Sequence, residues 1–117
     1  NKKLEILNDN NKTIIFSKSK EFNLKNNFWI KINYKSSIKS LTNKLYKLGV
    51  QSLIVEGGKK TIEGFLNENI FDEIRVFKSK KLLFNGIKSP EFKCNLKKEY
   101  KLGEDLVRIY SSSNKII

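Results

Sequence analysis

The spacing of apolar residues alternates between two periods along the middle of the chain, and this alternation constrains the fold most strongly. Apolar and polar side chains alternate in residues 27–34, as in a half-buried strand. In residues 38–48 the apolar side chains recur every three or four positions, as in an amphipathic helix. Residues 52–55 are mostly apolar, a helical pattern returns in residues 59–69, and residues 73–77 are typical of another strand. This order predicts parallel strands joined by right-handed crossovers, with helices against the sheet.

The last part of the chain shows a different pattern. Phe92, Cys94 and Leu96 alternate with polar residues, the sequence KLGED forms a turn signal, and residues 106–110 are again apolar and β-branched. We therefore expect an antiparallel hairpin at the C-terminal end. Cys94 is predicted to be a small buried apolar residue rather than a reactive thiol.

Local signals mark the ends of the first helix. Ser36 and Ser37 are both candidates for its N-cap, and Gly49 is the expected stop. An additional β-branched and aromatic run at residues 12–18 predicts a buried strand before the alternating region. With 117 residues the chain can bury one core, so we expect a single α/β domain over residues 1–117. Its sheet is expected to be mainly parallel, with flanking helices and the C-terminal hairpin.

The chain is strongly basic, with a formal net charge of +12. Of its 24 basic residues only Arg75 and Arg108 are arginine, and the lysines are scattered along the whole length. Base recognition favours arginine, and stacking needs aromatic side chains grouped on one face. A solvated lysine coat is therefore favoured over a specific nucleic-acid site, and its field still attracts small phosphorylated ligands.

The chain has no histidine and one cysteine, which restricts its chemistry. These counts exclude zinc clusters, internal disulfides and nucleophiles activated by histidine, so no metal site is expected. A lone cysteine suits a reducing compartment, and no apolar run is long enough to span a membrane. We expect a cytoplasmic protein without a membrane partner.

One candidate site stands where the predicted strand 52–55 meets the second helix. Ligands of open α/β sheets bind beyond the carboxyl ends of strands, and Gly57 and Gly58 lie at such an end. Glycines allow close approach of a phosphate, and the amides of the helix start, around Lys60 to Ile62, favour negative charge. An ionised Glu56 at a buried edge would cost solvation energy, which also suggests a site. A simple tight turn between strand and helix is the alternative.

A longer sequence pattern adds to this interpretation. The stretch LIVEGGKKTIEGFLNENIFDEIRVFKSKKLLFNGIK, followed by YKLGEDLVRIY, resembles the C-terminal reductase domain of the bifunctional riboflavin-biosynthesis deaminase/reductase. That family shows a strand running into V-E-G-G, a helix, D-E at the next strand, a K-x-x-G loop and a final hairpin. The resemblance covers roughly residues 38–110 in order.

The resemblance implies a dihydrofolate-reductase-like fold and a reductase that uses NADPH. Its expected reaction converts 5-amino-6-(5-phosphoribosylamino)uracil, a phosphorylated pyrimidine, to the ribityl form. The chain is then the C-terminal part of the reductase domain, without the family's N-terminal strands and without the deaminase domain. We also expect a homodimer.

The resemblance also implies roles for individual residues. Gly57 and Gly58, with Lys60 and Thr61, are expected at the NADPH pyrophosphate, and Glu56 near the nicotinamide and substrate as the catalytic carboxylate. Ser17 and Lys18 are expected to hold the adenosine 2'-phosphate, with a plain surface loop as the alternative. Two other functions stay open: a catalytically silent interaction domain of the same fold, and a lysine-rich nucleic-acid-binding domain.

Overall fold

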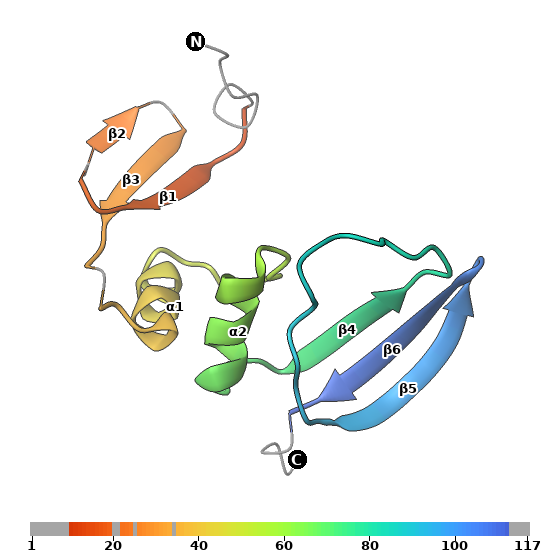
Figure 1. Ribbon diagram of the computed structural model, residues 1–117. Coiled ribbons are helices and arrows are strands. Elements are labelled where there is room, and N and C mark those ends of the chain that lie inside the picture. The colour runs from red at the N-terminus through yellow and green to blue at the C-terminus, as the bar shows by residue number, and fades with distance from the viewer. Residues whose placement is uncertain (1–9, 20–21, 25, 34, 113–117) are drawn as a thin grey trace. The chain divides into compact units, whose positions relative to one another are not determined.

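The computed structural model describes residues 10–19, 22–24, 26–33 and 35–112. The chain divides into two compact units, residues 1–36 and residues 37–117, which are described separately (Figure 1). Each unit contains one three-stranded sheet, and the second unit also contains two helices. The chain is therefore a mixed α/β protein.

The first unit is a small mixed sheet. Its strands are β1 (Thr13–Ser17), β2 (Phe22–Leu24) and β3 (Asn27–Lys31), in the order β1-β3-β2. β1 runs parallel to β3, with Ile14 opposite Phe28, and β2 runs antiparallel to β3. The strands predicted in residues 12–18 and 27–34 are confirmed with shorter bounds, and β2 was not predicted. The end of the second prediction, at residue 34, lies outside the described residues.

The helices of the second unit begin and end close to the predicted positions. α1 (Ile38–Lys47) has Ser37 as its N-cap, whose hydroxyl accepts a hydrogen bond from the Ser40 amide at 3.1 Å. Gly49, just beyond α1, has a φ of 86°, a left-handed conformation that favours glycine. α2 (Lys59–Asn67) follows the Gly57-Gly58 pair. Of the two serine candidates for the first cap, Ser37 is therefore the correct one.

The sheet of the second unit is entirely antiparallel. β4 (Glu73–Lys78), β5 (Asn95–Leu102) and β6 (Asp105–Ser111) lie in the order β4-β6-β5 (Figure 1). The predicted hairpin is thus confirmed, although β5 begins only at Asn95. Cys94 is half-buried rather than buried.

The sheet also contains the most deeply buried apolar side chain of the described residues. Val107 on the central strand is 0% exposed, and it pairs with Phe77 on one side and Tyr100 on the other. Phe77 is 61% exposed and Tyr100 38%. Among the described residues, Val107 is therefore the only completely buried apolar side chain.

The predicted parallel arrangement around residues 52–55 is wrong. These residues form no strand, and Leu53 and Ile54 are 48% and 85% exposed. β4 was expected to continue the same parallel sheet, but it pairs antiparallel with β6 instead. A central parallel strand is stabilised only by partners on both sides, and residues 52–55 pair with none of the described strands. The apolar run therefore remains extended and exposed.

Other large apolar side chains are also exposed. Between β4 and β5 the chain has no helix or strand over residues 79–94, and several of its apolar residues lie open to solvent. These are Leu82, Leu83, Phe84 and Ile87. None of the helices in the described residues is long and apolar enough to cross a membrane.

Candidate functional site

The candidate site is the start of α2 and the residues just before it. Residues 51–58 have no regular structure, and Gly58 is the N-cap of α2. The Gly58 carbonyl accepts hydrogen bonds from the amides of Thr61 at 3.0 Å and Ile62 at 3.1 Å. Gly58 has no side chain that accepts a hydrogen bond from the first turn. The helix therefore begins without the side-chain cap that serine or aspartate would supply.

The missing cap leaves donors at the start of α2. The Thr61 amide, which the sequence suggested for a ligand, is already used by the Gly58 carbonyl. Within the described part of the chain, the first-turn amides of Lys59 and Lys60 have no such backbone acceptor. Unpaired amides at a helix N-terminus favour a negatively charged group. Thr61 keeps its exposed side-chain hydroxyl as a second possible contact.

The two glycines leave open space beside these amides. A Cβ atom placed on Gly57 or Gly58 would meet no heavy atom within 4 Å, and neither residue has a positive φ. Packing within the chain therefore does not require glycine at either position. Close approach of a bound group is a physical reason for glycines that the fold itself does not need. The residues present fit a phosphate-bearing ligand.

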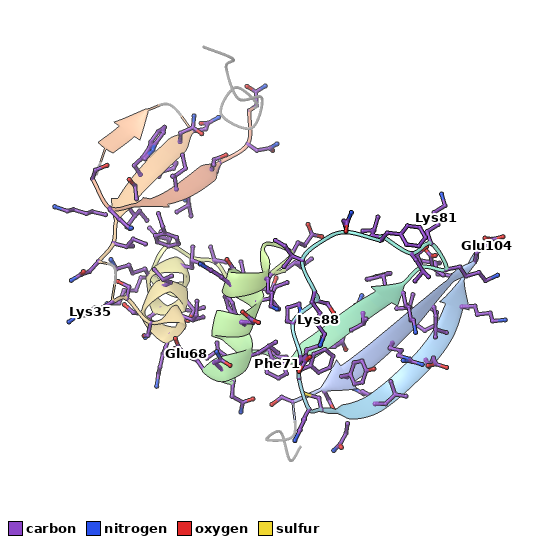
Figure 2. All side chains as sticks on the ribbon, in the orientation of Figure 1. Lys35, Glu68, Phe71, Lys81, Lys88 and Glu104 are labelled. Carbon is purple, nitrogen blue, oxygen red and sulfur yellow. The ribbon has the colours of Figure 1, made fainter. Side chains whose placement is uncertain are left out.

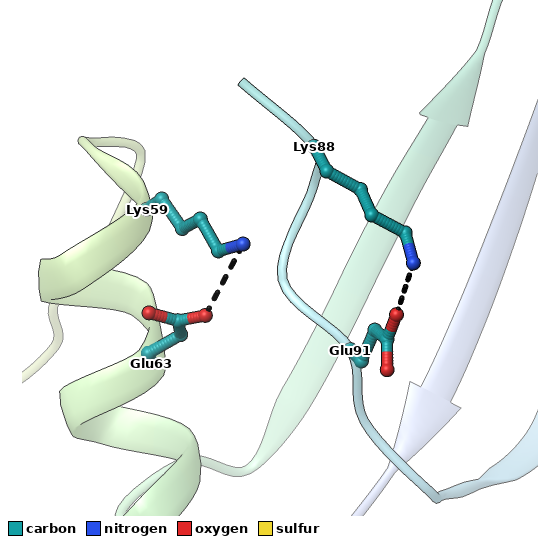
Figure 3. A network of polar contacts seen from close by, with 4 residues as sticks. All are labelled: Lys59, Glu63, Lys88 and Glu91. Atoms are coloured by element: carbon teal, nitrogen blue, oxygen red, sulfur yellow. Dashed lines mark hydrogen bonds and ion pairs between the residues drawn. The ribbon is translucent and has the colours of Figure 1, made fainter.

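The cations at this end of α2 lie near the surface. Lys59 forms an ion pair with Glu63 one turn later, with Nζ and Oε1 3.6 Å apart (Figure 3). Lys60 is exposed. Figure 3 also shows a second pair, in which the Lys88 Nζ donates to the Glu91 carboxylate on the segment between β4 and β5. Exposed pairs of this kind contribute little to stability. Lys59 can therefore exchange Glu63 for an anionic ligand, and the exposed Lys60 can bind one as well.

The carboxylate of Glu56 lies one residue before the glycines and is exposed. Among the described residues it has no hydrogen-bond or ion-pair partner. The expectation that Glu56 lies at a buried edge is therefore wrong, and the solvation cost expected there does not arise at an exposed position. Glu56 is a surface carboxylate beside the glycine pair.

Ser17 and Lys18 belong to the first unit, at the end of β1. The Ser17 hydroxyl accepts a hydrogen bond from the Ser19 amide at 3.4 Å, and the Ser17 carbonyl accepts one from Ile32 at 2.8 Å. Lys18 is exposed. Since β1 is confirmed, the two residues lie at a strand end as the sequence suggested.

One cavity in the second unit was not predicted from the sequence. It has a volume of about 230 Å³ and lies between the last turn of α2 and the chain just before β5. Asn69, which has a φ of 52°, turns the chain at its edge. The end of α2 was predictable from the sequence. No periodic pattern indicates that residues 91–94 lie beside it. The lining residues are Leu66, Asn67, Asn69, Phe71, Glu91, Phe92, Lys93 and Cys94.

Two arginines of the antiparallel sheet, outside the candidate site, have a raised pKa. A hydrogen bond to Glu99 raises the pKa of Arg108 above its ordinary value, and Glu73 has the same effect on the pKa of Arg75. Both arginines are charged at any physiological pH, so neither exchanges protons. The Arg108 pair joins β6 to β5, and the Arg75 pair lies within β4. In the described residues no three His, Cys, Asp or Glu side chains gather as a metal site.

Comparison with known proteins identifies the family. The model of the RibD C-terminal domain matches residues 1–107, and the chain belongs to this family. The chain is also similar to the riboflavin biosynthesis protein RibD of Aquifex aeolicus (strain VF5), with 40% identity over 80 residues. That similarity covers 61% of this chain and 22% of the relative, so the chain spans only about a fifth of the relative's length.

Proposed function

We propose that this chain is the reductase part of a riboflavin-biosynthesis enzyme that binds NADPH at the start of α2. The proposal rests on family membership over residues 1–107 together with the uncapped helix start beside two open glycines. The substrate proposed is 5-amino-6-(5-phosphoribosylamino)uracil, which is reduced to the ribityl form. The open glycine pair is the single structural observation that carries the cofactor assignment.

The residues of the site have separate roles in this proposal. The amides of Lys59 and Lys60 bind a pyrophosphate oxygen, and Gly57 and Gly58 let the phosphate approach the backbone. When bound, NADPH would supply a hydride to carbon 1' of the open imine form of the sugar, whose nitrogen takes up a proton. The protonated imine carries positive charge, and Glu56 stabilises that charge or orients the sugar hydroxyls. The exposure of Glu56 suits this role, because a bound ligand can then contact the carboxylate directly.

The 2'-phosphate of the cofactor has a separate proposed site, which rests on the family resemblance. Ser17 and Lys18 bind the adenosine 2'-phosphate, the Lys18 ammonium as a charge and the Ser17 hydroxyl as a donor. We further propose a dihydrofolate-reductase-like fold for the complete reductase domain, a homodimer, and a cytoplasmic location. Neither a membrane nor a specific nucleic acid is a partner in this proposal.

The glycine pair can be tested by calorimetric titration of the chain with NADPH. Gly58→Val should abolish measurable binding, because a branched side chain would fill the space through which the phosphate approaches. Gly86→Val is the matched control, since Gly86 also has open space around it and lies away from α2 in sequence. Binding of NADPH by Gly58→Val with unchanged affinity would refute the assignment.

The carboxylate can be tested by hydride-transfer kinetics. In a complete reductase that carries this site, Glu56→Gln should lower kcat by about ten- to a thousandfold, the scale of one electrostatic contact in a transition state. The NADPH affinity should change little, because the charge that Glu56 stabilises lies on the imine of the substrate and not on the cofactor. Full turnover in Glu56→Gln would make this carboxylate structural and favour the silent interaction domain.

The 2'-phosphate site predicts cofactor selectivity. NADPH should bind more tightly than NADH by about 1.5–3 kcal/mol, the contribution of a hydrogen bond to a charged group. Lys18→Ala should remove most of this preference, whereas Lys35→Ala, another exposed lysine, should keep it. Equal affinities of the parent chain for the two cofactors would contradict the proposed roles of Ser17 and Lys18.

A further inference from the structure

The carboxylate of Glu68, at the end of α2, lies on the N-terminus of α1. Its Oε1 accepts a hydrogen bond from the Ile38 amide at 2.7 Å, and its Oε2 accepts one from the Lys39 amide at 3.0 Å. Figure 2 labels Glu68 at the end of α2. One side chain thus satisfies two of the first-turn donors that an α-helix leaves unpaired. The two helices are joined by a bidentate contact.

The N-terminus of α1 suits a carboxylate from another element. Its own first turn contains no acidic residue, and its N-cap Ser37 accepts hydrogen bonds from the Ser40 amide with its hydroxyl and from the Leu41 amide with its carbonyl, but not from the Ile38 or Lys39 amides. The partial positive charge at a helix start favours a nearby anion. Hydrogen bonds with an ionised acceptor are also stronger than neutral ones. Glu68 therefore completes the cap that the α1 sequence leaves partly open.

A second contact between the helices lies one turn earlier in α2. A Cβ atom on Gly64 would be 3.0 Å from Cγ1 and 3.1 Å from Cδ1 of Ile38, so the α2 backbone lies directly against this side chain. Gly64 and Glu68 are four residues apart and hence on one face of α2. Both contact the first residue of α1. Together they connect the last turn of α2 to the first residues of α1.

These contacts matter because α2 is short and has no fully buried residue. A nine-residue helix depends on tertiary contacts for its stability. We propose that Glu68 is a positioning residue: by tying the end of α2 to α1, it holds the start of α2 ready for a phosphate. This inference rests on the proposed function, because it assigns Glu68 to the binding of NADPH through Gly58 and the Lys59 amide.

The experiment compares Glu68→Ala, Glu68→Gln and the parent chain by calorimetric titration with NADPH. Glu68→Ala should weaken NADPH binding about five- to tenfold, within the usual range of coupling between distant groups. Glu68→Gln keeps one acceptor oxygen and should lie between the two. Amide hydrogen exchange should show faster exchange at Ile38 and Lys39 in Glu68→Ala, which confirms that the contact exists in solution.

Two controls separate positioning from general stability. Ser37→Ala removes the other cap of α1 without touching α2, so it should destabilise α1 but leave the NADPH affinity within about twofold. Glu104→Gln removes one exposed carboxylate in the β5–β6 turn, and it controls for the change in net charge. Titration with 2'-AMP, which lacks the pyrophosphate, should give the same affinity for Glu68→Ala as for the parent chain.

The possible failures are distinguishable. If the parent chain does not bind NADPH, the proposed function fails and the role of Glu68 fails with it. If the parent chain binds NADPH and Glu68→Ala binds it equally well, the positioning role is refuted and the proposed function stands. The positioning role is also refuted if Ser37→Ala weakens NADPH binding as much as Glu68→Ala does, since stability of α1 would then explain both.

Discussion

Two regions of the second unit have similar apolar sequences but different structures. Residues 106–110 form most of β6, where Val107 is completely buried, whereas residues 52–55 form no strand and expose Leu53 and Ile54. Both were predicted to be strands from their composition. Apolar content alone therefore does not decide which of these regions becomes a strand.

The difference follows from where each region finds its partner. β6 is joined to β5 by the two-residue turn Gly103-Glu104, so its partner strand is adjacent in the sequence. A parallel strand has no such local partner and depends on crossover connections of a dozen or more residues. Closing a long connection costs more chain entropy than closing a short one. A hairpin can thus form from its own sequence, whereas a central parallel strand depends on distant segments.

The largest loss of stability expected from truncating a side chain tests the burial of the hairpin region. Val107→Ala should lower the free energy of unfolding by about 2–3 kcal/mol, because it removes methyl groups from a fully buried site. Val55→Ala is the matched control, since it makes the same change at a half-buried position next to the unpaired region. Urea unfolding followed by circular dichroism measures both. Equal losses of unfolding free energy for the two variants would contradict the difference in burial between residues 106–110 and residues 52–55.

The next effect concerns the turn that makes the hairpin local. Gly103 has a φ of 62°, a left-handed conformation that costs other residues roughly 1–2 kcal/mol. Gly103→Ala should therefore reduce the free energy of unfolding by about that amount. Gly86→Ala, at a glycine without a positive φ and with open space around it, should change it little. A neutral Gly103→Ala would show that the turn does not adopt this conformation in solution.

A third effect tests a local signal outside the sheet. Ser37→Ala should lower the free energy of unfolding by about 1 kcal/mol, the usual loss for an N-cap hydroxyl. Ser36→Ala should change the free energy of unfolding little, because it is the Ser37 hydroxyl that accepts the cap hydrogen bond. If the two substitutions had the same effect in urea unfolding, the choice of cap would be wrong.

The parts of the fold that the sequence predicted are those with local signals. The α1 cap at Ser37, the start of α2 after Gly58, and the β5–β6 hairpin each depend on residues close together in the chain. The short strand β2 was missed because three residues carry no measurable period. Residues 52–55 were misassigned because a buried strand and an exposed apolar run have the same local composition.

The candidate site shows the same limit. Gly57 and Gly58 were predicted from their place before a helix, and the structure gives them an open position at its start. The surroundings of Glu56 were not predictable, because its burial depends on whether residues 52–55 have partners. The contact of Glu68 with the α1 amides was also missed, since it joins residues 30 positions apart and leaves no periodic signal.

The smallest expected effect tests the unpaired region directly. Ile54 is 85% exposed, so Ile54→Lys should change the free energy of unfolding of this chain by less than about 0.5 kcal/mol. A lysine at a buried strand position would place a charge in an apolar site, and the loss of unfolding free energy would be several times larger. Val107→Lys is the matched comparison and should prevent stable folding of the β4-β6-β5 sheet. Urea unfolding of both variants measures the contrast. A loss above about 1.5 kcal/mol for Ile54→Lys would mean that Ile54 is buried in solution and that residues 52–55 do pair as a strand.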